Sequence, residues 1–144
     1  MRYSIMIETE MLKLRLLTAC EVRMWAEDLP ALEGKLGCKY MGEPVEGIFR
    51  DIILGQAEKA ENDEANCAFH SFWLVIRKTD NIAVGSFGFK HPPNENCEVE
   101  IGYGLGKVHE GNGYMTEAVA AICKWAKARD DVDYVIAETE SHNP

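Results

Sequence analysis

Hydrophobic residues recur with different periods along the chain, and each period predicts a different element. Leucine occupies every second position of residues 12–16 between polar neighbours, which predicts a first strand that ends near Thr18. Thr18 is followed three residues later by Glu21, the spacing of a helix capping box, so a helix is expected over residues 21–28. A second short helix is expected over residues 31–36.

A longer helix is predicted over residues 45–61, where apolar residues recur at helical spacing and the other face is charged or amide-bearing. The stripe expected to face the core consists of Val45, Ile48, Phe49, Ile52 and Ile53. Residues 62–66 are polar and are expected to form a loop.

The pattern then changes to that of strands. The continuous apolar run at residues 72–76 predicts a buried strand, Asp80-Asn81 predicts a turn, and a second strand is expected over residues 82–89. A third strand is predicted over residues 97–105, with Cys97, Val99, Ile101 and Tyr103 on one face and glutamates and glycines on the other.

A glycine-rich turn follows, and then a helix is predicted over residues 114–129. Its apolar stripe consists of Met115, Ala118, Val119, Ile122 and Ala126. A last strand is expected from Tyr134 towards Thr139. This order of strand, helices, strand meander, helix and strand predicts a mixed α/β fold and a single domain over residues 1–144.

Charge changes the range of expected partners. The formal net charge is −9 and the isoelectric point is about 4.9, so binding of nucleic acid through a basic face is not expected. The same charge favours cationic substrates such as amines, although acidity also serves solubility alone. No apolar run approaches the ~18–20 residues of a membrane span, so no membrane insertion is expected.

The cysteines indicate a reducing compartment. They are odd in number and occur singly, without a C-x-x-C pair, at Cys20, Cys38, Cys67, Cys97 and Cys123. Together with an N-terminus that lacks a signal-peptide pattern, this predicts reduced thiols and a cytoplasmic location.

The segment most informative about chemistry joins the third strand of this meander to the last helix. A loop with Gly111 and Gly113 precedes the helix, which leaves backbone N–H groups unpaired at the positive end of the helix dipole. Glycine lets a ligand approach the backbone closely, so the segment fits a pyrophosphate site. A tight connection without a ligand is the alternative. A Rossmann fingerprint is disfavoured because Met115 and Thr116 follow and the turn lies late in the chain; a P-loop lacks its Gly-Lys-Ser/Thr.

The sequence of this segment resembles that of the GNAT superfamily of N-acetyltransferases. It reads Glu-Ile-Gly-Tyr and then Gly-x-Gly-Tyr-Met-Thr-Glu-Ala. It is similar to the branch that contains the ribosomal-protein N-terminal acetyltransferases and many small-molecule acetyltransferases. Glu-Thr-Glu-x-Leu-x-Leu-Arg at residues 8–15 and Ile-Ala-Glu-Thr at residues 136–139 also resemble that branch. The resemblance covers nearly the whole chain in the expected order.

The resemblance implies a central, mostly antiparallel twisted sheet flanked by helices. By comparison with the family, the C-terminal helix and the last strands are absent, and a homodimer partner or another chain is expected to cover the exposed last strand. The implied activity moves the acetyl group of acetyl-CoA to a primary amine, on a protein N-terminus or a small molecule, by direct attack. A catalytically impaired CoA-binding domain acting in association or sensing is the alternative, and a purely structural interaction domain is a third reading.

Site residues follow from the resemblance position by position. The pyrophosphate motif, Q/R-x-x-G-x-G/A, falls on Glu110, Gly111, Asn112, Gly113, Tyr114 and Met115, and the helix continues with Thr116. Glu110 and Met115 depart from the motif, and a carboxylate there is unfavourable for a pyrophosphate. The strand stretch that pairs with the pantetheine arm corresponds to Tyr103, Gly104 and Leu105.

Glu100 is the candidate catalytic base because it lies on the strand that leads to the motif. The alternative is a solvated strand residue, since Glu98 shares its face. A backbone N–H near Gly104 or Leu105 is the expected donor to the oxyanion. His70, His91, His109 and His142 complete no ligand set, so no metal is expected.

Overall fold

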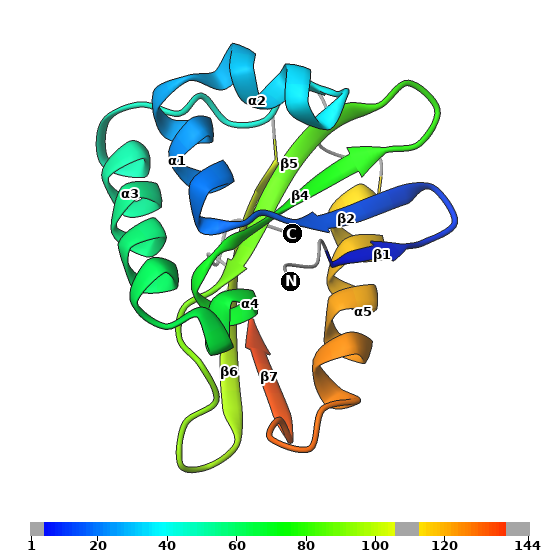
Figure 1. The fold of residues 1–144 in the computed structure, drawn as a ribbon. Helices are drawn as coiled ribbons and strands as arrows, with labels where there is room; N and C mark the ends of the chain where they lie inside the picture. Colours follow the sequence, from blue (N-terminus) through cyan, green and yellow to red (C-terminus); the bar gives the residue numbers. More distant parts are fainter. Residues whose placement is uncertain (1–4, 106–112, 138–144) are drawn as a thin grey trace.

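The computed structural model describes residues 5–105 and 113–137, which build one seven-stranded sheet with helices on both faces (Figure 1). The strands are β1 (Met6–Glu8), β2 (Leu12–Leu16), β3 (Lys39–Tyr40), β4 (Phe72–Arg77), β5 (Ile82–Phe89), β6 (Glu98–Leu105) and β7 (Tyr134–Ala137). Their order is β1-β2-β4-β5-β6-β7, and β3 pairs with β5. Only the β3–β5 and β6–β7 pairings are parallel among these strands, so the predicted mixed, mostly antiparallel sheet is confirmed.

The helices divide between the two faces of the sheet. They are α1 (Ala19–Glu27), α2 (Leu29–Leu36), α3 (Gly47–Asn62), α4 (Cys67–His70) and α5 (Tyr114–Lys127), with a 3₁₀ turn η1 (Glu64–Asn66) before α4. Helices α1, α2 and α3 pack on one face, whereas α5 covers the other (Figure 1). The two faces of the sheet therefore carry separate hydrophobic cores.

Strand β4 shows how one apolar run serves both cores. Trp73 and Val75 are fully buried on the α5 side, and Leu74 and Ile76 are buried on the α1–α3 side. Because side chains of a strand alternate between faces, a strand covered on both sides needs no polar positions. The predicted buried strand is confirmed, as is the turn after it, where Asn81 has a φ of 55°.

The start of α1 confirms the predicted capping box. Thr18 Oγ1 accepts a hydrogen bond from the Glu21 N–H at 3.1 Å, and Glu21 Oε1 accepts one from the Thr18 N–H at 2.9 Å. Arg15 Nη1 also donates to Glu21 at 2.8 Å, and Lys35 Nζ lies 3.1 Å from the second oxygen. Burial opposes the ionisation of Glu21, but these donors outweigh it and lower its pKa to about 2.

Helix α3 corrects one expectation. Ile48 and Ile52 were expected in the core stripe, but they are 79% and 52% exposed, while Ile53, Ala57 and Ala60 face the sheet. The helix is rotated so that the residues one position further along point inward. Strands β1 and β3 and helix α4 were not predicted from the sequence; each is only two to four residues long.

Candidate active site

Helix α5 begins with backbone N–H groups that no side chain of the described residues caps. Gly113, its N-cap residue, has φ 76° and ψ 5°, and the first intrahelical bond runs from the Glu117 N–H to the Gly113 carbonyl. The amides of Tyr114, Met115 and Thr116 precede that bond and have no acceptor within the helix. Together with the helix dipole, they make this end of α5 suited to an anion.

Two contacts from distant parts of the chain fix the position of this helix end. The Glu117 carboxylate accepts hydrogen bonds from the Thr9 hydroxyl and, at 2.9 Å, from the Met11 N–H, both in the turn between β1 and β2. Arg77, at the end of β4, donates to the hydroxyl of buried Tyr114 at 3.2 Å. The first turn of α5 is therefore held in a defined place beside the sheet.

Strand β6 presents a row of backbone donors at one edge. The Lys90 N–H donates to the Glu100 carbonyl at 2.7 Å, so by the alternation of an antiparallel ladder the N–H groups of Gly102 and Gly104 also face β5. The N–H groups of Tyr103 and Leu105 then point to the opposite edge. The described pairing with β7 on that edge ends at Ile101↔Ala137. Of the two expected oxyanion donors, Leu105 has its N–H on this edge, and Gly104 does not.

Glu100 lies on the face of β6 that α3 covers. Its carboxylate forms an ion pair of 2.8 Å with Lys90, its neighbour on the adjacent strand, and its side chain is 21% exposed. Gly104 is four residues further along β6, a separation of ~13 Å in an extended strand. The structure thus places Glu100 on the expected face but not directly beside the Leu105 N–H.

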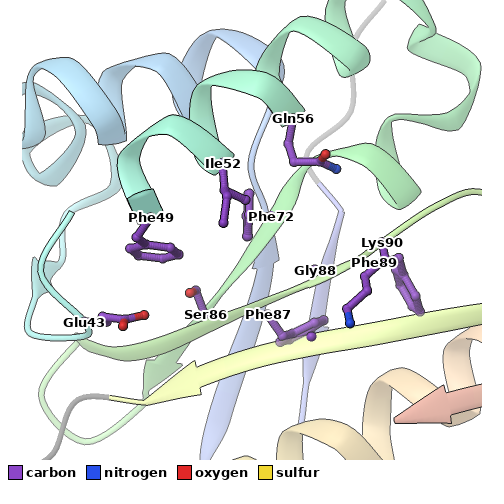
Figure 2. Close-up of a pocket in the computed structure, with 11 residues that line it drawn as sticks. Glu43, Phe49, Ile52, Gln56, Phe72, Ser86, Phe87, Gly88, Phe89 and Lys90 are labelled. Atoms are coloured by element: carbon purple, nitrogen blue, oxygen red, sulfur yellow. The ribbon is translucent and has the colours of Figure 1, made fainter. Parts of the chain in front are cut away.

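A cavity of about 440 Å³ lies between α3 and the β5–β6 part of the sheet (Figure 2). Helix α3 contributes Phe49, Ile52 and Gln56 to its lining, and β4 contributes Phe72. Its floor is formed by residues 86–90 and by Gly102. Figure 2 shows the α3 side chains pointing down towards the strands, with Glu43 at one end of the cavity and Lys90 at the other.

Small residues keep this floor open. A Cβ at Gly88 would lie 3.2 Å from the Phe72 ring and from the Ser71 carbonyl oxygen, closer than ordinary packing. One at Gly102 would meet the Lys90 side chain at 3.5 Å. Ser86 is 4% exposed and pairs in register with Gly104, so its hydroxyl lies on the cavity side of the sheet.

The sequence did not point to most of this cavity. Phe49 was expected in the stripe that faces the core, and it lines the cavity while packing edge-on against Trp25. Ser86, Gly88 and Lys90 were missed. The available signal was their alternation with Phe87 and Phe89, which places small or polar residues on one face of an otherwise apolar strand.

Several predicted site residues can be placed only in part. Glu110, Gly111 and Asn112 lie outside the described residues, and for Tyr103, Gly104 and Leu105 the backbone alone is described. Met115 is partly buried against the α5-side core, and Thr116 is exposed in the first turn of α5.

Two searches of the described residues bear on other kinds of site. Within residues 5–105 and 113–137, no three histidine, cysteine or acidic side chains gather as a metal ion would require. His70 instead contacts Asp63, with 2.9 Å between Nε2 and Oδ2. None of the helices in this part of the chain has the length and apolar character needed to cross a bilayer.

The chain is similar in sequence to a family of acetyltransferases. The family model described as "Acetyltransferase (GNAT) domain" matches residues 22–144. The "Uncharacterized N-acetyltransferase YjdG" of Bacillus subtilis (strain 168) is 29% identical over 138 residues, which are 89% of this chain and 82% of that protein. The "Uncharacterized N-acetyltransferase p20" of Bacillus licheniformis is 32% identical over 94 residues, 65% of this chain, and the match spans half of that protein's length.

Solved structures show the same fold at low sequence identity. The RimL ribosomal L7/L12 alpha-N-protein acetyltransferase in complex with coenzyme A has a TM-score of 0.65 and 16% identity, covering 96% of this chain and 77% of that one. The ribosomal-protein-S5-alanine acetyltransferase from Vibrio fischeri also has a TM-score of 0.65 and 16% identity, covering 96% and 76%. With the family model matched over most of its length, the chain belongs to the GNAT acetyltransferase family.

Proposed function

We propose that this protein transfers the acetyl group of acetyl-CoA to a primary amine, and that residues 1–144 act as one domain. The observation that carries the proposal is the uncapped start of α5 at Gly113, which lies on the chain directly after the strand that carries the donor edge. An anion site and a row of backbone donors on two elements match two adjacent parts of CoA, its pyrophosphate and its pantetheine arm.

The cofactor contacts follow from this geometry. The amides from Gly113 to Thr116 bind the pyrophosphate, and Glu110, Gly111 and Asn112, which lie outside the described residues, are assigned to the same site by the resemblance of their motif alone. The Tyr103 and Leu105 N–H groups pair with the amides of the pantetheine arm along β6, with Gly104 between them. Arg77 and Glu117 support the site indirectly, because they hold the first turn of α5 in position.

In the reaction, the amine loses a proton and its nitrogen attacks the thioester carbon. The N–H at Leu105 stabilises the tetrahedral oxyanion. The C–S bond then breaks, the nitrogen loses its second proton and the CoA thiolate takes up a proton, so that the acetylated amine and the CoA thiol are released. Glu100 accepts the proton that the ammonium loses before its nitrogen attacks, and this proton passes through water because Glu100 is not directly beside Leu105. Lys90 orients the carboxylate of Glu100 through their ion pair of 2.8 Å. The acceptor amine occupies the cavity under α3.

The same ion pair favours a second candidate function. A carboxylate held by Lys90 at 2.8 Å is less available as a base, which suits a CoA-binding domain with impaired catalysis. The two functions differ in turnover and not in CoA binding, so they can be separated by measuring both.

Titration calorimetry with acetyl-CoA tests the first half of the proposal, and release of free CoA thiol over a panel of amines tests the second. We expect Glu100→Gln to lower kcat by about 100-fold while acetyl-CoA affinity is retained. Glu98→Gln is the matched control. Glu98 lies two residues away on the same face of β6, and its carboxylate accepts a hydrogen bond from the side-chain amide of the loop residue Asn94. Binding without turnover for any amine would support the impaired domain, and no heat with a folded sample would refute both.

A further inference from the structure

The cavity under α3 has a lining whose chemistry restricts the acceptor. Its middle is apolar on both sides, with Phe49, Ile52 and Phe72 above and the glycine backbone of β5 and β6 below (Figure 2). Charged side chains lie only at the ends among its lining residues, and Lys90 at one end is paired with Glu100. The Gln56 amide nitrogen donates to the His70 carbonyl at 2.8 Å, so that donor is engaged as well.

This lining is unsuited to an acceptor with several positive charges. Each buried ammonium needs a carboxylate or several oxygen acceptors to offset its lost hydration. Among the described residues that line the cavity, Glu43 is the single acidic one. A second ammonium would lie between Phe49 and Phe72, where these residues offer no carboxylate.

Ser86 adds a polar requirement. Its side chain is 4% exposed and projects from the strand towards α3 (Figure 2). Within the described part of the chain, the structure shows no hydrogen bond to its hydroxyl. The hydroxyl is not fully enclosed, because Ser86 lines the cavity, and a ligand in the cavity can be its hydrogen-bond partner.

We infer that the acceptor is a monoamine with an apolar body of aromatic or branched size and a neutral hydrogen-bonding group that reaches Ser86. Polyamines and aminoglycosides are excluded as preferred acceptors. The inference rests on the proposed function and identifies its substrate class. The apolar body fills the space between α3 and β5, and the neutral group satisfies the Ser86 hydroxyl.

Matched acceptors test the class. Phenylalanine amide carries one amine, an aromatic body and a neutral amide, whereas spermidine is a polycation of comparable length. We expect kcat/KM for phenylalanine amide to exceed that for spermidine by about tenfold or more, since a buried unpaired charge is costly. Spermidine as the better acceptor would overturn the inference while leaving acetyl transfer intact.

Two substitutions on the same helix locate the effect. Ile52→Glu places a carboxylate in the cavity wall, and Ile48→Glu places one a single helical turn away, on a side chain that is 79% exposed and does not line the cavity. Ile52→Glu should lower the preference for phenylalanine amide by about tenfold, and Ile48→Glu should leave it within about twofold. Equal effects of the two variants would contradict the placement of the acceptor.

The role of Ser86 is read from a second pair of acceptors. 2-Phenylethylamine has the same aromatic body as phenylalanine amide but lacks the amide. Ser86→Ala should raise KM about tenfold for phenylalanine amide and change it little for 2-phenylethylamine, because only the former loses a hydrogen bond. An equal change for both would remove Ser86 from the inference.

A direct measurement of acceptor binding tests the inferred acceptor class independently of acetyl transfer. Saturation-transfer NMR of phenylalanine amide with the CoA-loaded protein requires no turnover. Binding that Ile52→Glu removes and Ile48→Glu retains would support the acceptor class even if no thiol were released. If both variants still bound phenylalanine amide, or if the unmodified protein did not bind it, the inferred acceptor class would be refuted whether or not the protein transfers acetyl groups.

Discussion

Glu21 is a charged residue that the fold surrounds almost completely. Its side chain is 1% exposed, yet it receives hydrogen bonds or ion pairs from Arg15, Lys35 and the Thr18 N–H. One residue thus joins the end of β2, the start of α1 and the end of α2. A buried carboxylate contributes to stability only while all its partners are present, so this is a point where a single change has a large effect.

Stability is expected to depend on pH through this carboxylate. Because its pKa is lowered from 4.5 to about 2 in the folded state, its stabilisation is complete above about pH 4.5 and is lost as the pH falls towards 2. Glu21→Gln should lower the free energy of unfolding by about 3 kcal/mol at pH 7 and by much less near pH 2.5. Urea denaturation at both pH values measures this.

The control for that experiment is another glutamate bound to an arginine. Glu61 pairs with Arg23 on the surface, both about 40% exposed, and exposed pairs contribute little. Glu61→Gln should change the free energy of unfolding far less than Glu21→Gln does at pH 7. If the two variants were equally destabilised, the buried network would not have the role assigned to it.

At the scale of elements, the start of α5 depends on the backbone conformation of one residue. Gly113 has a φ of 76°, a region that costs an L-residue with a side chain about 1–2 kcal/mol. Apart from its chain neighbours, no atom of the described residues lies within 4 Å of a Cβ placed there, so the cost among these residues would be conformational and not steric. Gly113→Ala should therefore lower acetyl-CoA affinity and stability together, as measured by calorimetry and thermal unfolding.

Gly55 provides the comparison, because it lies inside α3 with helical geometry and open space around its Cβ position. Gly55→Ala should raise stability by about 0.5–1 kcal/mol and leave acetyl-CoA affinity unchanged. A loss of affinity in both variants would show that the effect at Gly113 is not local to the anion site.

The helices and strands that could be predicted from the sequence are those whose own residues show a hydrophobic period or a capping motif. Periodicity located β2, β4, β5, β6 and α5, and the Thr18–Glu21 spacing located α1. Strands β1 and β3 were missed because each is defined by a partner strand elsewhere in the chain. Their few residues carry no period of their own.

The candidate site was predictable where it depends on one continuous segment and not where it depends on packing. The Gly113 turn could be placed from its motif. The cavity could not, because it forms where α3, β4, β5 and β6 meet. Ile48 and Ile52 show the difference, since apolar character alone does not say whether a helix face meets the core, a cavity or solvent.

At the scale of the whole molecule, the net charge of −9 affects how fast a charged acceptor reaches the protein, and it does not affect the rate of acetyl transfer once the acceptor is bound. A cationic acceptor is attracted from a distance, and salt screens that attraction over a Debye length of about 8–10 Å near physiological ionic strength. We expect kcat/KM for an amine acceptor to fall several-fold between about 10 and 150 mM salt, with kcat unchanged. A fall in kcat instead would place the effect of salt at the reacting groups.

The expected homodimer stays a prediction, which light scattering can test.

The bond between Thr9 and Glu117 joins residues 108 positions apart. During synthesis, the N-terminal hairpin leaves the ribosome long before the helix that it anchors, and contacts of such long range form late in folding. The nascent protein is therefore expected to gain affinity for acetyl-CoA only after the β1–β2 turn and α5 have met, so that binding of acetyl-CoA would report that this contact has formed.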